Sequence, residues 1–216
     1  MALANPLAIA DFYDRFRVQD VTFVQGPQQQ RSATGGGETR YADRAPSLWK
    51  ADVTTQPLLN AEAEGIMALI NSRGGGLKTV LLYNSRLPYP SSDPKGQIIG
   101  ATVPKLGVIT DRLHVAFTGF PAGYLIPLGT YFSIQFDTSR FYLGQFAEAR
   151  TANPITGTVG ATEVWPPLPA SISGTPDVVI VKPPAKFRIE PGSAFLSKEG
   201  GLHSTIKFSA EQTYSR

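Results

Sequence analysis

The chain has 216 residues, of which 42% are hydrophobic and 17% charged, and its net charge is +3. This length and hydrophobic content are sufficient for one large or two small domains with real cores, and the scattered Lys and Arg residues form no nucleic-acid-binding patch. Cysteine is absent, which excludes disulfides, thiolate catalysis and cysteine-based metal sites.

The start of the chain is apolar but has no basic segment, and it reaches Asp11 too early for a membrane-spanning helix. We therefore expect a soluble, unsecreted protein. The 21 glycines and 18 prolines are typical of short strands joined by turns, so the predicted class is mainly β. Residues 9–16 predict one amphipathic turn or a short helix, and Val18, Val21 and Phe23 predict a first strand.

Residues 25–46 have no apolar period. They contain three consecutive glutamines, three consecutive glycines and five charged residues, which leaves little for a core. A loop of this length is uncommon inside a compact domain and is usually functional or disordered. We interpret it either as a bridge to a neighbouring subunit or as a surface hairpin, and the sequence leaves both readings open.

Residues 48–89 predict a strand, a helix and a second strand. Residues 49–55 alternate between apolar and polar side chains, and residues 79–83 are apolar on both faces. The helix between them has one apolar face, formed by Leu59, Ala63, Ile66, Met67 and Ile70. We expect Asn60 to cap its start, Arg73 to complement the negative end of the helix dipole and Gly74 to stop it.

Two proline-rich stretches, residues 87–96 and 166–176, divide the chain. About five short strands lie between them, which suits a small barrel, and strands at 178–181, 186–190 and 205–211 follow. The predicted fold is an antiparallel β-sandwich with one flanking α-helix, carrying an inserted small β-barrel of the oligonucleotide-binding type. The sandwich consists of residues 1–92 and 176–216, and the barrel of residues 93–175.

No catalytic signature accompanies this architecture. The glycine-rich segment from Arg73 to Thr79 lies between a helix and a strand, in the reverse of the phosphate-loop order. The two histidines, His114 and His203, have no metal-ligand spacing, and a Gly-x-Ser-x-Gly motif is missing. We expect no enzyme activity, catalytic residues, metal or cofactor. A pair of carboxylates for glycoside hydrolysis stays open, because the sequence does not give their spatial separation.

Aromatic residues cluster on one predicted hairpin of the barrel. The cluster consists of Tyr131, Phe132, Phe136, Phe141, Tyr142 and Phe146. Exposed aromatics on such barrels stack bases or sugars. However, Phe132 and Phe136 belong to the inward set of an alternating strand, which favours core packing. Exposure of Tyr131 and Tyr142 on either side of a groove would favour a module that binds glycans or a host surface.

The chain also resembles a known family through motifs distributed along nearly its whole length. They are residues 10–15 (Ala-Asp-Phe-Tyr-Asp-Arg), the glycine-rich loop before Leu48-Trp49, the capped helix, residues 81–83 and 88–90, Leu128-Gly129-Thr130-Tyr131, Trp165-Pro166-Pro167-Leu168 and Val181-Lys182-Pro183-Pro184. In these motifs the chain is similar to phage distal tail proteins.

The resemblance implies a ring-forming β-sandwich with an inserted oligonucleotide-binding-like barrel. It also implies a structural virion protein at the distal end of a long, non-contractile tail, assembled in the host cytoplasm. Six copies would form a ring that joins the tail tube protein to the tail-tip or baseplate hub proteins and leaves a lumen for DNA. The resemblance implies neither specific nucleic-acid binding nor membrane binding.

A ring subunit needs faces that complement its neighbours. We hypothesise that Arg31, Arg40, Arg44 and Trp49 contribute to contacts with a neighbouring subunit or with the tube. A tail-terminator or tube-like subunit is a further structural alternative, and a tube protein would form long stacks.

Overall fold

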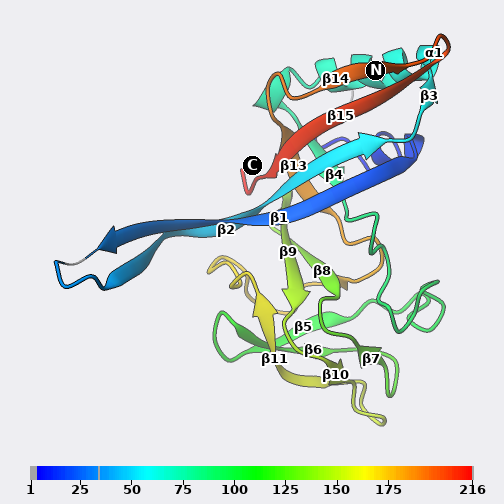
Figure 1. Cartoon of the computed structure of the whole chain (residues 1–216). Helices are drawn as coiled ribbons and strands as arrows, with labels where there is room; N and C mark the ends of the chain where they lie inside the picture. Colours follow the sequence, from blue (N-terminus) through cyan, green and yellow to red (C-terminus); the bar gives the residue numbers. More distant parts are fainter. Residues whose placement is uncertain (1–3, 34, 216) are drawn as a thin grey trace.

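The structure is a computed structural model and describes residues 4–33 and 35–215. Over these residues the protein is mainly β, with antiparallel sheets and one α-helix, as the composition predicts (Figure 1). The 3-10 helices are η1 (Tyr13–Arg15) and η2 (Gly75–Leu77). Of the two alternatives predicted for residues 9–16, the single turn is confirmed, as η1.

Seven of the described strands form the first sheet, in the order β1-β2-β15-β13-β4, with β3 and β14 also paired to β15. They are β1 (Val18–Ala33), β2 (Thr39–Thr55), β3 (Leu58–Leu59), β4 (Thr79–Leu82), β13 (Ala185–Ile189), β14 (Phe195–Glu199) and β15 (His203–Gln212). The two ends of the chain thus contribute to one hydrogen-bonded sheet, and a single helix packs against it.

The helix α1 (Asn60–Asn71) buries Ala63, Ile66 and Ile70 against this sheet, as its apolar period predicts. The predicted cap is wrong. Leu59 occupies the N-cap position, and the Asn60 side chain instead donates to the Gly201 carbonyl and accepts from Ser204 Oγ at 2.8 Å. Tertiary partners on the β14–β15 hairpin therefore replace the local cap.

The end of the helix combines a confirmed and a corrected prediction. Gly74 adopts the left-handed conformation at φ 64°, which suits a helix stop. Arg73 is fully buried, and its Nη1 donates to the Ala4 carbonyl at 3.0 Å. Arg73 lies just beyond the last turn of α1, which contains no basic residue, and it joins the end of the helix to the N-terminal segment.

The interpretation of residues 25–46 as a surface hairpin is confirmed, but the expectation of an irregular loop without strands is wrong. These residues continue β1 and β2 as one long antiparallel hairpin that projects away from the body (Figure 1). Pairing between two polar strands requires backbone groups but no apolar alternation, so the sequence pattern gave no sign of it.

The second sheet has the strand order β12-β8-β9-β11-β6-β5. Its strands are β5 (Lys105–Ile109), β6 (His114–Thr118), β8 (Tyr131–Phe136), β9 (Arg140–Phe146), β11 (Val159–Trp165) and β12 (Val178–Val179). The short strands β7 (Leu125–Ile126) and β10 (Arg150–Thr151) pair with each other. The predicted hairpin turn at 137–140 is confirmed, with Asp137 at φ 57°.

No closed barrel is found among the described strands. An isolated bridge joins Lys105 of β5 to Asp177, just before β12, so the two edge strands approach each other at one end without a continuous ladder. β12 lies within residues 176–216 but pairs with β8. The second sheet therefore includes a strand from the C-terminal stretch of the chain.

Candidate functional site: the hairpin arm and the groove at its base

The most distinctive surface feature is the part of the β1–β2 hairpin that leaves the body, residues 27–46, which we call the hairpin arm (Figure 1). Its described side chains are exposed except for the half-buried Thr39. Gln29 Nε2 donates to Asp43 Oδ1 at 2.8 Å within the arm, and Glu38 pairs with Arg40 at 3.8 Å. None of the described arm residues belongs to either hydrophobic core.

Two irregularities mark the base of the arm. The register shifts between Gly26 and Gln28, and again between Gln28 and Gln29, whose partners on β2 are Ala45 and Asp43. The second shift leaves Arg44 without a cross-strand partner, as in a β-bulge, which bends a hairpin and redirects one side chain. Arg44 has no hydrogen bond or ion pair with any described residue.

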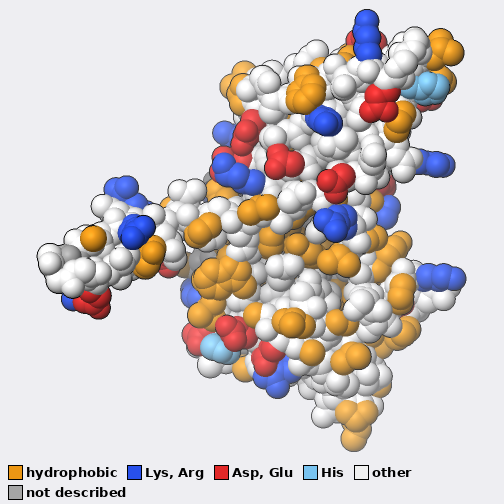
Figure 2. Space-filling view, in the orientation of Figure 1, with side chains coloured by type: hydrophobic (Ala, Val, Ile, Leu, Met, Phe, Trp, Pro, Cys, Tyr) orange, Lys and Arg blue, Asp and Glu red, His pale blue; other side chains and the backbone are white. Residues whose placement is uncertain are grey.

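Beside Arg44 lies a groove between the arm base and the loop that follows β11. Its cavity volume is about 360 Å³. The lining residues come from both sheets and are Gln29, Asp43, Arg44, Ala45, Pro46, Ser47, Arg112, Trp165, Pro167, Leu168, Pro169 and Ala170. Hydrophobic side chains gather on the body next to the arm base (Figure 2). The groove thus combines an apolar floor with charged groups at its edge.

Hydrogen bonds hold the loop side of the groove in place. The buried Tyr142 hydroxyl donates to the Pro166 carbonyl, and the Leu168 amide donates to the Arg112 carbonyl at 2.7 Å. The Arg112 guanidinium in turn donates to the carbonyls of Pro169 and Ala170 at 3.2 and 3.3 Å. This wall of the groove is therefore formed before any partner arrives.

The four residues predicted to contact a neighbour lie in two different environments. Arg31, Arg40 and Arg44 are exposed on the arm. Arg31 is opposite Tyr41 in the register and Arg40 is opposite Ser32, so these two arginines point to opposite faces of the hairpin. They are separated from the body, which is the position expected of contact residues.

Trp49 is a correction to this prediction, because its side chain is only 3% exposed and cannot meet a neighbour. Its indole Nε1 donates to the Leu143 carbonyl of β9 at 2.8 Å, and its ring lies 5.5 Å from the Tyr131 ring. Its amide donates to Gln212 Oε1, and Gln212 Nε2 donates to the Phe141 carbonyl. Trp49 therefore joins the first sheet to the second.

The predicted sugar platform is also absent from the surface of the described chain. Tyr131 is 7% exposed and Tyr142 is fully buried, so the preferred interpretation as core residues is confirmed. Trp165, by contrast, is 42% exposed and lines the groove. The sequence singles out Trp165 only within the motif Trp165-Pro166-Pro167-Leu168 and does not predict that its ring is exposed.

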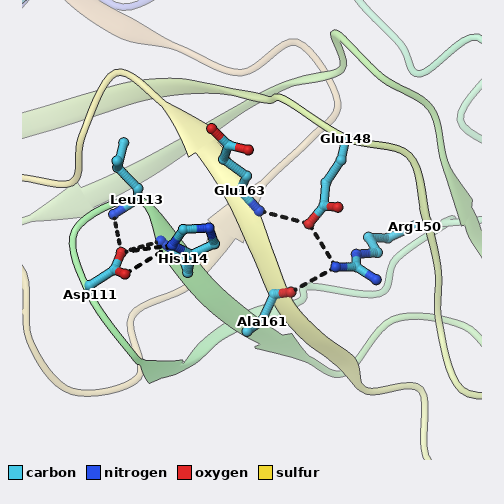
Figure 3. A network of polar contacts seen from close by, with 7 residues as sticks. All are labelled: Asp111, Leu113, His114, Glu148, Arg150, Ala161 and Glu163. Carbon is cyan, nitrogen blue, oxygen red and sulfur yellow. Dashed lines mark hydrogen bonds and ion pairs between the residues drawn. The ribbon is translucent and has the colours of Figure 1, made fainter.

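A separate polar network lies on the second sheet (Figure 3). Asp111 accepts the Leu113 and His114 amides, each at 2.7 Å, and its Oδ2 lies 2.9 Å from His114 Nδ1. The hydrogen bond to Asp111 raises the pKa of His114. Glu148 accepts the Glu163 amide at 2.9 Å and pairs with Arg150 at 2.8 Å. These contacts connect the ends of neighbouring strands at an exposed site.

The described residues contain no group of three or more His, Cys, Asp or Glu side chains arranged to hold a metal ion. Within residues 4–33 and 35–215, no helix is long and apolar enough to cross a membrane. The glycines after α1 form the turn η2 between helix and strand, as their order along the chain predicts.

Comparison with known proteins adds no further assignment. No protein-family model matches this chain, and no curated protein matches it.

Proposed function

We propose that this protein is a structural subunit of a phage tail. Copies of it assemble into a hexameric ring at the distal end of the tail, join the tail tube to the tip or baseplate hub, and leave a lumen for DNA. The observation that carries this proposal is the hairpin arm, supported by the resemblance of the sequence to distal tail proteins.

Beyond its base, the arm is not packed against either hydrophobic core of the described chain. A two-stranded hairpin without packing is marginally stable in water, and the described arm residues are almost all exposed. A neighbouring subunit that covers the arm would supply the missing contacts. At about 3.3 Å per residue, the seven residues of β1 in the arm, 27–33, extend it about 23 Å, which is enough to lie across a neighbour.

The arm projects from one side of the subunit (Figure 1), and this position favours a ring. An arm that contacts a different surface on the next copy makes a head-to-tail interface, and such interfaces close into rings when the rotation permits. Arg31 and Arg40 on opposite faces of the hairpin give it two charged surfaces, and arginine is enriched at protein interfaces. The same geometry would carry contacts to the tube protein.

The second sheet extends this proposal. Its six strands and the Lys105–Asp177 bridge bring the edge strands together at one end, and we interpret it as an open variant of the inserted oligonucleotide-binding-like barrel. In this role it is a platform on the ring for hub proteins. The alternative function, a module that binds glycans or a host surface, is favoured by one observation, the exposed Trp165 in the groove.

The test compares the full chain with a variant whose arm is removed. Residues 27–47 are replaced by Asn-Gly, a two-residue hairpin turn that closes the register pair Gly26–Leu48. Light scattering at two ionic strengths gives the mass of each protein, alone and with tube protein added. We expect a six-subunit species for the full chain and a monomer for the variant, with unchanged thermal unfolding. A full chain that stays monomeric with tube protein present would contradict the proposal.

A further inference from the structure

We propose that the groove at the base of the arm binds a short anionic oligosaccharide, with Trp165 as the stacking residue and Arg44 as the residue that recognises a sugar carboxylate. The proposal does not depend on ring assembly, because both sides of the groove belong to one chain.

The size of the groove suits a small carbohydrate. Its volume of about 360 Å³ lies near the lower end of the range of about 300–1,000 Å³ for ligand pockets. Trp165 presents the exposed aromatic surface, and a tryptophan ring offers a broad apolar face with a polar edge. Pyranose rings have a matching apolar face of C–H groups, which is the chemistry that Tyr131 and Tyr142 would have supplied in the alternative interpretation of the sequence.

The polar side chains that line the groove with Trp165 include hydrogen-bond donors and acceptors that have no partner among the described residues. No ion pair or side-chain hydrogen bond joins Arg44 to another described residue, so its guanidinium N–H groups are available to a ligand. Asp43 Oδ1 accepts from Gln29 Nε2, and among the described residues no hydrogen bond involves Asp43 Oδ2. Sugar hydroxyls both donate and accept, so a mixed set of side chains suits them better than a set of one kind.

The charge of the groove selects an acidic sugar. Its charged lining residues are Arg44, Arg112 and Asp43, which leaves an excess of one positive charge. Arginine binds a carboxylate through two parallel hydrogen bonds, and the bulge at the arm base holds Arg44 out of the strand pairing for this purpose. A neutral sugar would leave the Arg44 charge unmatched.

One wall of the groove is held in a fixed conformation, which favours ligand binding. The bonds from Tyr142 to Pro166 and from Arg112 to Pro169 fix the loop wall, and a rigid wall lowers the entropic cost of binding. A segment of a neighbouring protein is the competing occupant, and it is an outcome of the test below.

The test uses the two tryptophans of the full chain. Trp165 is 42% exposed and Trp49 is 3% exposed, so their indole N–H signals in a nitrogen–proton correlation spectrum and their acrylamide quenching are distinguishable. The probes are tetragalacturonate, a hyaluronan tetrasaccharide and sialyllactose, with cellotetraose as the neutral control, each added up to millimolar concentration. Variants are Trp165→Ala and Arg44→Ala. Binding to Trp165→Ala is followed by isothermal titration calorimetry, with the full chain measured in the same way, because this variant lacks the reporter indole. Arg31→Ala is the matched control, because Arg31 is an exposed arm arginine outside the groove.

We expect at least one acidic probe to shift the Trp165 signal and protect it from quenching, with weaker binding at high salt. Trp165→Ala and Arg44→Ala should each weaken binding about tenfold or more, which corresponds to about 1.4 kcal/mol, whereas Arg31→Ala should change it less than about twofold. Three results would overturn the proposal: no binding of any acidic probe, equal binding by the groove variants, or Trp165 protection that depends only on protein concentration, which would assign the groove to a protein contact.

Discussion

Replacing Trp49 by alanine should destabilise the whole molecule, because this side chain joins the two sheets. Truncation of a buried tryptophan costs about 3–5 kcal/mol, and part of this loss comes from the Leu143 carbonyl, which would lose its 2.8 Å bond to the indole. For a chain of this size, each kcal/mol lowers Tm by about 2–4 °C. The expected decrease is therefore about 6–20 °C.

The assay is thermal unfolding followed by circular dichroism and by calorimetry. Trp49→Phe keeps an aromatic ring but removes the indole donor, so its loss should be intermediate, at about 2 kcal/mol. Trp165→Ala is the matched control, because Trp165 is 42% exposed, and its loss of stability should be clearly smaller than that of Trp49→Ala. A loss below about 1 kcal/mol for Trp49→Ala would refute the reasoning that Trp49 connects the two cores.

Three other predictions concern local features. Burial raises the pKa of Asp93. The backbone amides that donate to its carboxylate lower the pKa by more than burial raises it, so the net pKa lies below the ordinary 3.8. Asp93→Ala should therefore cost about 1–3 kcal/mol near neutral pH, and the difference from wild type in urea unfolding should shrink as the pH falls through the folded-state pKa. The hydrogen bond that His114 Nδ1 donates to the Asp111 carboxylate raises the pKa of His114 above 6.5, so Asp111→Asn should lower that pKa in an NMR titration. Gly157 has φ +63°, and an added Cβ would lie 2.1 Å from a backbone oxygen, so Gly157→Ala should reduce thermal stability more than Gly123→Ala, which has φ +69° and open space.

Each of these predictions has a contradicting result. A pH-independent Asp93→Ala effect would mean that the carboxylate charge is not what the amides stabilise. An unchanged His114 titration in Asp111→Asn would remove the hydrogen bond as the cause of the shift. Equal losses for Gly157→Ala and Gly123→Ala would show that backbone conformation alone, and not the close approach, limits position 157.

The sequence predicted those elements whose apolar period reflects burial. The face of α1 and the buried strand β4 lie where their patterns predict. β8 also forms where predicted, but both of its faces are buried except at Gln135, so the alternation predicted for it is wrong. The apolar alternation of β2 also predicts that Trp49 is buried, because Trp49 lies on the same face of the strand as Ala51 and Val53, which are buried too. Placing Trp49 at a subunit surface went against that pattern.

Other features could not be predicted because their partners are distant in the sequence. Asn60 binds the β14–β15 hairpin instead of its own helix, and Arg73 binds the N-terminal segment. The hairpin arm has polar strands that pair only with each other, so it has no apolar period. The groove combines Arg44 with Trp165, and only the folded chain brings them to one cavity.

The central claim, that the arm makes subunits join head to tail into a closed ring, is tested most directly by electron microscopy of the purified full chain, alone and with tube protein. The account predicts class averages with six-fold symmetry, a central opening and stacks of one or two layers, all lost when the arm is removed. Single particles under both conditions, or rings that persist without the arm, would contradict it.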